Sequence, residues 1–218
     1  MGRIFSGFVK LTAYPAELVC FRTKIHYEDK KEQGRKIKGA AILICNHTAV
    51  WDFAQLMQIF FGRHIRCLTA DLMFKKNKAM NFLMTHLDMI KISRESKNFS
   101  FIEESLDVLN EGGVIEIYPE SRILKPGEQF PLEFKPSAAY IALLSRAPVI
   151  PVYTDGNYFG KGRANVIIGK KIDVNTLIDE DADVSENIKR INDHMRNRIV
   201  ELKNELEKRK EEKQRKKI

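Results

Sequence analysis

The sequence of 218 residues predicts an α/β domain with a mostly parallel sheet flanked by helices, an amphipathic N-terminal helical segment and a long C-terminal helix. Two observations support this fold class. Short apolar runs of strand length alternate with longer segments in which apolar residues recur at helical spacing. The hydrophobic fraction of 44% in a chain of this length also provides for one sizeable core. Such alternation is typical of parallel sheets that helices cover on both faces.

Residues 1–38 form a basic segment that is amphipathic in its first half. Between residues 3 and 22, apolar side chains cluster around a few basic ones, which predicts one or two short helices with Pro15 as the break. The apolar face either covers the core, which is the more frequent outcome, or lies in a membrane interface. The polar stretch 26–39 is expected to be a connection, with room for a short strand around Ile37.

Residues 39–183 are expected to form the core of the fold. Strands are predicted at 40–45, 65–69, 89–93, 114–118, 149–154 and 165–169. Helices are predicted between them at 50–61, 77–86, 99–110 and 137–146. In open sheets of this kind, ligands gather beyond the carboxyl ends of the strands. Polar residues that directly follow a strand are therefore candidates for a functional site.

Residues 184–218 are expected to form an amphipathic helix followed by a charged basic tail. Apolar residues recur at steps of three and four from Val184 to Leu206, and Asp183 with Glu186 offers a capping box. The apolar stripe ends after Leu206, so we expect the chain to fray there.

The net charge of +8 is concentrated at the two ends of the chain. Residues 1–38 hold nine Lys and Arg against four Asp and Glu, and residues 189–218 hold twelve against six, whereas the remainder holds sixteen against nineteen. A basic surface suits nucleic acid or an anionic bilayer. Nucleic acid is disfavoured, because the basic tail interleaves acidic residues and lacks aromatic ones. The expected partner is an anionic membrane surface.

The cysteines and the short apolar runs both favour a location in the cytoplasm. Three cysteines without paired spacing argue against a disulfide framework and for a reducing environment. The longest apolar runs fall far short of the ~18 residues that a spanning helix needs. We expect a cytoplasmic protein, peripheral on the inner face of the cell membrane.

The stretch ILICNHTAVWDF, residues 42–53, carries the first candidate site. An apolar strand stops at Asn46 and His47, and Asp52 follows five positions after the histidine. Across a turn from strand to helix, the Asp52 carboxylate can accept a hydrogen bond from one ring nitrogen and leave the other to act as a base. The alternative is a histidine that only caps the turn.

Further polar residues follow two other predicted strands. Arg94 comes directly after strand 89–93, and Glu120, Ser121 and Arg122 come soon after strand 114–118. A base, a carboxylate and two arginines that converge at one edge of the sheet would suit an alcohol that carries a phosphate.

Two other chemistries, a thiol nucleophile and a zinc site, are disfavoured by the sequence. A thiol nucleophile at Cys45 is disfavoured, because this residue ends an apolar strand. A zinc site built from His64, Cys67, His47 and Asp52 lacks a second pair of ligands at the usual spacing. We therefore expect neither a metal nor a cofactor.

Four blocks, in this order, resemble the glycerolipid acyltransferase family, whose best-known members are the 1-acylglycerol-3-phosphate acyltransferases. NHTAVWD resembles the family's Asn-His-x-x-x-x-Asp block, MIKISR its second block, YPESR its third and APVIPV its fourth. The resemblance spans roughly residues 40–170, and four ordered blocks are far more specific than one. PESR is one residue shorter than the family's Pro-Glu-Gly-Thr-Arg, so Arg122 follows Glu120 by two positions.

The resemblance implies a glycerolipid acyltransferase fold and a role for each matched residue. His47 would be the general base that takes the proton of an acceptor hydroxyl, and Asp52 would orient its imidazole. Arg94 and Arg122 would hold the acceptor's phosphate, and Glu120 would orient Arg122 or the glycerol hydroxyls. Asn46 and Ser121 complete the expected substrate-binding set. The acyl donor would be acyl-CoA or an acyl carrier protein, and the acceptor a lysophospholipid such as lysophosphatidic acid.

A second function, from a different class, is also open. The chain could be a non-catalytic peripheral membrane protein that binds anionic lipid through its basic ends. Such a binder has no use for a base with a paired carboxylate, so it would be indifferent to the substitution His47→Ala.

Overall fold

The computed structural model describes residues 2–93, 99–125, 127–159 and 162–216. Its strands are β1 (Lys24–Tyr27), β2 (Ala41–Cys45), β3 (Ile65–Ala70), β4 (Ile90–Ile92), β5 (Val114–Ile117), β6 (Val149–Thr154) and β7 (Asn165–Ile168). Its helices are α1 (Gly2–Cys20), α2 (Asp52–Ile59), α3 (Asp71–Lys75), α4 (Lys78–His86), α5 (Ser100–Asn110), α6 (Ser137–Ser145), the 3-10 helix η1 (Val174–Leu177) and α7 (Val184–Arg215).

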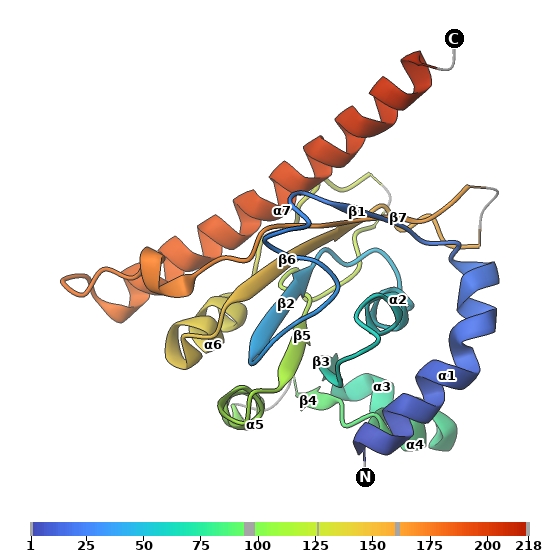
Figure 1. The fold of residues 1–218 in the computed structure, drawn as a ribbon. Coiled ribbons are helices and arrows are strands. Elements are labelled where there is room, and N and C mark those ends of the chain that lie inside the picture. Colours follow the sequence, from blue (N-terminus) through green and yellow to red (C-terminus); the bar gives the residue numbers. More distant parts are fainter. Residues whose placement is uncertain (1, 94–98, 126, 160–161, 217–218) are drawn as a thin grey trace.

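The strands form one sheet in the order β1-β7-β6-β2-β5-β3-β4. Strands β2 to β6 run parallel to one another, whereas β7 is antiparallel to β6 and β1 pairs parallel with β7. Helices α5, α6 and α7 lie on one side of the sheet and α1 to α4 on the other (Figure 1). This arrangement confirms the predicted fold class.

Strand β2 shows why the central strands are almost wholly apolar. Its side chains alternate between the two faces of the sheet. Ile42 and Ile44 belong to the core beneath α5, α6 and α7, whereas Leu43 and Cys45 belong to the core beneath α2. All five residues of β2 are buried, so the sequence cannot alternate with polar residues as a half-exposed strand would.

Two expectations for the N-terminal segment are wrong. Helix α1 runs unbroken through Pro15, which lies on its exposed side, where water can satisfy the carbonyl left without a donor. The short strand lies at β1, not around Ile37. Ile37 is nevertheless buried in the core beneath α2.

The C-terminal helix is longer than expected. The capping bond forms, since Glu186 N–H donates to Asp183 Oδ1 over 2.8 Å, but the helix does not fray after Leu206. Charged side chains of its last turns reach the body of the protein: Arg209 Nη1 donates to the Tyr27 carbonyl over 2.9 Å, and Lys210 bonds to Asp155 over 2.5 Å. Beyond Leu206, where the apolar stripe ends, these polar contacts hold the helix against the body of the protein.

Helix α1 turns its apolar stripe outward. Ile4, Phe8 and Leu11 are 81%, 61% and 69% exposed, and Leu18 and Val19 continue the stripe. At about 100° per residue, these five positions fall within an arc of about 100°. The opposite side, which faces the protein, carries the buried residues Gly2, Ser6 and Lys10. Helix α1 also covers the core, because Phe5 and Val9 pack against the cluster that contains Met57 and Met84, while the exposed stripe points outward.

Candidate active site

Three neighbouring strands direct polar residues to one edge of the sheet. His47 follows the carboxyl end of β2, Glu120 follows β5 and Tyr158 follows β6. Strand β2 lies between β5 and β6 and pairs with both in parallel. The three loops therefore meet beyond the same ends of the strands, where an α/β sheet forms its ligand site.

His47 and Asp52 form the predicted pair. The ring Nδ1 of His47 lies 2.8 Å from Asp52 Oδ2. Asp52 begins helix α2 and is 1% exposed, while the side chain of His47 is 22% exposed. An acceptor at Nδ1 favours the neutral tautomer that carries its proton there, and in that tautomer Nε2 carries the lone pair.

Five donors hold the Asp52 carboxylate in place. Oδ2 accepts from His47, from Thr48 N–H at 2.7 Å and from Ala49 N–H at 3.0 Å. Oδ1 accepts from the Thr48 hydroxyl at 2.8 Å and from the Tyr158 hydroxyl at 2.6 Å. The backbone of the turn therefore binds the same oxygen that orients the imidazole, so the carboxylate cannot rotate without breaking several bonds at once.

Tyr158 is a site residue that no sequence pattern indicates. Its hydroxyl also lies 2.9 Å from Gln55 Oε1 on helix α2. Burial and the neighbouring Asp52 charge raise the pKa of Tyr158, so the phenol stays protonated as a donor. Gly156 has a φ of +64°, and a Cβ there would lie 2.5 Å from the Thr48 hydroxyl, so only glycine lets this loop approach so closely.

Asn46 and Glu120 hold the backbone around His47. The Asn46 amide is buried and bridges to strand β6, with Nδ2 donating to the Thr154 carbonyl and Thr154 N–H donating to Oδ1, both over 2.9 Å. Glu120 is 2% exposed and accepts from the N–H groups of His47 at 3.0 Å and Leu132 at 3.2 Å. Burial raises the pKa of Glu120. Both side chains act on the backbone and so position the histidine.

The ring of His47 stacks on Tyr118, with ring centroids 4.4 Å apart and planes 27° from parallel. The Tyr118 hydroxyl bonds to the fully buried Glu116 of strand β5. Burial raises the pKa of Glu116 to about 8. The imidazole is thus held through its ring face as well as through Nδ1.

Comparison with known proteins decides the family. The sequence profile of the acyltransferase family matches residues 22–155, which include both members of the dyad. The chain belongs to the acyltransferase family. It is 24% identical over 176 residues to the 1-acyl-sn-glycerol-3-phosphate acyltransferase of Bacillus subtilis (strain 168), covering 76% of this chain and 82% of that protein.

A solved structure shares the fold of this acyltransferase. The crystal structure of the 1-acyl-sn-glycerophosphate acyltransferase PlsC from Thermotoga maritima superposes with a TM-score of 0.62 over 91% of this chain and 78% of that one, at 18% identity. The resemblance to the glycerolipid acyltransferases is confirmed.

Of the two arginines expected to bind the acceptor's phosphate, the structure describes only one. Arg94 lies outside the described residues. Arg122 is exposed and makes a two-pronged ion pair with Glu128, with N–O distances of 2.7 and 2.8 Å. This pair lowers the pKa of Glu128 to about 2. Arg122 is therefore oriented by Glu128, whereas Glu120 bonds to backbone. Ser121, between Glu120 and Arg122, adopts a φ of +57° at the turn.

The thiol chemistry that the sequence left open finds no support in the geometry. Cys45 is fully buried, and burial raises the pKa of its thiol well above the usual range. In the described part of the chain, no three His, Cys, Asp or Glu side chains gather as a metal site would require.

Tyr158→Phe tests the hydrogen bond to Asp52. A bond to a carboxylate stabilises by roughly 1.5–3 kcal/mol, so we expect kcat to fall about tenfold or more while KM for both substrates stays unchanged. Tyr140→Phe, on helix α6, serves as the matched control. A fall in KM or in thermal stability without a fall in kcat would contradict a positioning role.

Proposed function

We propose that this acyltransferase moves a fatty acyl group from an acyl thioester to a hydroxyl of a lysophosphatidic acid-like acceptor, with His47 as general base. The observation that carries the proposal is the fixed dyad, in which Asp52 occupies Nδ1 and leaves Nε2 available. The donor is acyl-CoA or an acyl carrier protein. The match to a 1-acyl-sn-glycerol-3-phosphate acyltransferase over 82% of that protein supports the class of acceptor.

The reaction passes one proton through His47 and needs no acyl-enzyme. His47 Nε2 takes the proton of the acceptor hydroxyl as its oxygen attacks the thioester carbonyl carbon. The tetrahedral intermediate collapses with cleavage of the C–S bond, and the imidazolium returns the proton to the leaving thiolate. Asp52 stabilises the imidazolium between these two steps. The products are an ester and a free thiol.

The acceptor's phosphate would bind Arg122, and Arg94 after strand β4. An arginine fork matches a phosphate in the same two-pronged way that it now holds Glu128. Glu128 therefore competes with the phosphate for this guanidinium. Ser121 lies beside it and completes the proposed contacts.

Glu128→Gln is expected to lower KM for the phosphorylated acceptor. The pair is exposed, and exposed ion pairs contribute roughly 0.2–1 kcal/mol, so the expected change is about two- to fivefold with kcat unchanged. Arg122→Gln should shift KM in the opposite direction. A rise in KM after Glu128→Gln would mean that Glu128 aims the arginine for the substrate and does not compete with it.

The acyl chain and the membrane would meet the protein on its apolar outer surface. Val50 and Trp51, next to the dyad, are 50% and 48% exposed, and Phe159 lies with its ring centroid 5.9 Å from that of Trp51. Helix α1 ends beside this surface, because the buried Phe21, which directly follows α1, has its ring centroid 5.9 Å from that of Phe159. Among the described residues, no helix has the length and hydrophobicity to cross a bilayer. We propose peripheral attachment through α1 to an anionic, cytoplasmic membrane face.

Replacement of Phe8 and Leu11 by Asp is expected to release the protein from anionic vesicles. Each side chain contributes roughly 1.5–3 kcal/mol when it leaves water, so binding in a sedimentation assay should fall at least tenfold. Turnover of short-chain, water-soluble substrates should persist. Val184→Asp, which changes an exposed apolar residue of α7, is the matched control. Unchanged sedimentation of the double variant would exclude α1 as the anchor.

Product analysis tests the proposed acceptor. The protein is incubated with palmitoyl-CoA, or with a palmitoyl carrier protein, and an equimolar mixture of lysophosphatidic acid, lysophosphatidylcholine and glycerol 3-phosphate. Mass spectrometry should find phosphatidic acid as the main product. A preference for lysophosphatidylcholine would overturn the acceptor assignment. No product with either donor would favour the non-catalytic lipid binder.

A further inference from the structure

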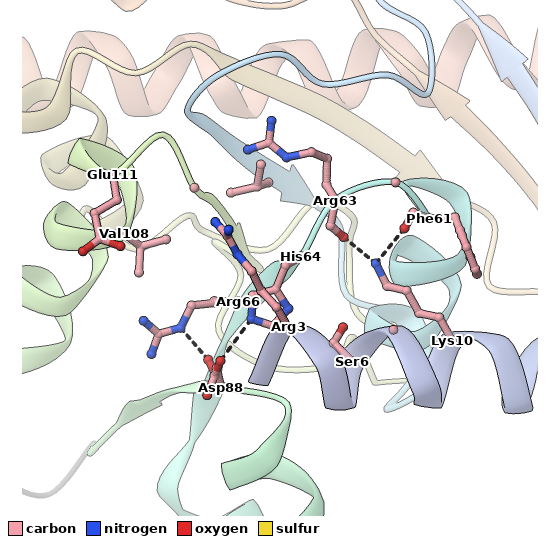
Figure 2. A pocket seen from close by; sticks show the side chains of 14 residues that line it. Arg3, Ser6, Lys10, Phe61, Arg63, His64, Arg66, Asp88, Val108 and Glu111 are labelled. Atoms are coloured by element: carbon pink, nitrogen blue, oxygen red, sulfur yellow. Dashed lines mark hydrogen bonds and ion pairs between the residues drawn. The ribbon is translucent and has the colours of Figure 1, made fainter. Parts of the chain in front are cut away.

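A cavity of about 730 Å³ lies at the end of the sheet remote from His47. Its wall includes Val114, the first residue of β5, and His64, just before β3. The dyad lies beyond the other ends of these strands, and the length of β5 alone separates the two places by roughly 10 Å. Figure 2 shows this cavity between the first turns of α1 and the start of β3.

Four cationic side chains line the cavity: Arg3, Lys10, Arg63 and Arg66. The acidic side chains there are Asp88 and Glu111. Asp88 is engaged by His64, 3.2 Å from its Nε2, and by the start of α1, since a Cβ on Gly2 would overlap its carboxylate. The lining is therefore net positive, and the half-exposed Asp88 is already bonded to His64.

Three of the cations are fixed by the protein itself. Lys10 Nζ bonds to the Phe61 and Arg63 carbonyls, Arg63 donates to the carbonyls of Ile37 and Gly112, and Arg66 donates to the Asp88 carbonyl over 2.6 Å. Burial lowers the pKa of Lys10 to about 8. Arg66 also forms an ion pair with Glu104, so the positive field in the cavity comes from Lys10 and Arg63, which bond only to carbonyl groups.

Two buried polar groups in the cavity wall have no partner within the described residues. The Ser6 hydroxyl is buried, with the residue 1% exposed, and makes no hydrogen bond. The Nδ1 of His64 is also buried and makes none, although Nε2 bonds to Asp88. Arg3 extends toward the cavity from the first turn of α1 (Figure 2). Buried polar atoms are rarely left unpaired, so this arrangement points to a polar occupant.

We propose that this cavity binds a phosphate group, with Arg3 and Ser6 as donors to its oxygens and His64 Nδ1 bonding to a hydroxyl or oxygen of the same ligand. The field of Lys10 and Arg63 favours an anion. A cavity of this volume accommodates a ligand larger than inorganic phosphate, such as a phospholipid headgroup. The site is separate from the proposed acceptor site, and the inference does not rest on the catalytic assignment.

Imidazole resonances of the full-length protein test the site. The chain has five histidines, so His64 and His47 can be followed separately in a ¹⁵N-histidine spectrum. Titration with inorganic phosphate at constant ionic strength should move the His64 resonance along a saturating curve that differs from any response of His47. Chloride should not reproduce it. A His64 resonance that stays in place with phosphate and with short-chain phosphatidic acid would overturn the proposal.

Variants separate binding from general electrostatics. Arg3→Gln should weaken the phosphate response about tenfold, as expected for loss of a charge-assisted contact. Ser6→Ala should weaken it a few-fold without lowering thermal stability, because the hydroxyl has no partner in the protein to lose. Lys189→Gln makes the same change of charge on an exposed position of α7 and should have no effect. Equal weakening in Arg3→Gln and Lys189→Gln, with no effect of Ser6→Ala, would mean diffuse electrostatic attraction and no built site.

The source of the phosphate is decided by a second titration. Short-chain phosphatidic acid, kept below its micelle concentration, and vesicles that contain phosphatidylglycerol are compared with inorganic phosphate. Tighter binding of the lipid forms, lost in Arg3→Gln, identifies a headgroup site beneath α1. Equal affinity for all three identifies a site for soluble phosphate.

Discussion

His47→Ala is expected to reduce acyl transfer by a factor of about 10³ or more. General base catalysis contributes roughly 10²–10⁴ in rate, and the substitution also leaves the Asp52 carboxylate without its imidazole. The fall should appear in kcat, because no part of the proposed phosphate contact involves His47. Initial rates of thiol release at saturating acceptor measure it.

His194→Ala, on helix α7, provides the matched control for His47→Ala. Its rate should equal that of the wild type. Retention of more than a tenth of the wild-type rate by His47→Ala would contradict the role of general base, since an alanine cannot accept a proton and water is a poor substitute.

Asp52→Asn is expected to lower kcat by roughly 10²–10³. The N–H groups of Thr48 and Ala49 require an acceptor at the Oδ2 position, so the asparagine oxygen should take that place and still bind Nδ1. The amide NH₂ would then face the Thr48 and Tyr158 hydroxyls, which can rotate to accept. The tautomer of His47 is kept, and what is lost is the charge that stabilises the imidazolium.

The double variant distinguishes positioning from an independent role of Asp52. In a His47→Ala background, Asp52→Asn should cause little further loss, because both changes remove the same proton transfer. Additive losses would show that Asp52 acts on the substrate directly. Circular dichroism and thermal unfolding of each variant establish that Asp52, which is buried, can be replaced without loss of the fold.

The sequence predicts the dyad because its geometry is local. His47 and Asp52 are five residues apart, across a strand end and a helix start that both have clear patterns. Tyr158 is 106 residues from Asp52, and only the pairing of β6 beside β2 brings them together. A tyrosine after a strand is a weak signal without that order. The Arg122–Glu128 pair spans six residues, yet its loop has no periodicity to indicate which carboxylate turns toward the arginine.

The central strands could be predicted and the edge strand could not. Strands such as β2 are buried on both faces, so an almost continuous run of apolar residues predicts them. Strand β1 has four half-buried residues and owes its place to pairing with β7, about 140 positions later. The periodicity of α1 likewise predicts an apolar stripe but not whether the stripe faces the protein or the solvent. That orientation depends on which face of α1 contacts α2 and α4.

The most direct measurement is thiol release from palmitoyl-CoA by the purified full-length protein, with lysophosphatidic acid in mixed micelles and His47→Ala measured beside it. We expect thiol release that requires the acceptor, equals the phosphatidic acid formed mole for mole and disappears in the variant. A carrier-protein donor replaces the CoA ester if the latter is inert. The proposed reaction would be contradicted by thiol release that persists in His47→Ala, by release without acceptor, or by the absence of release with both donors.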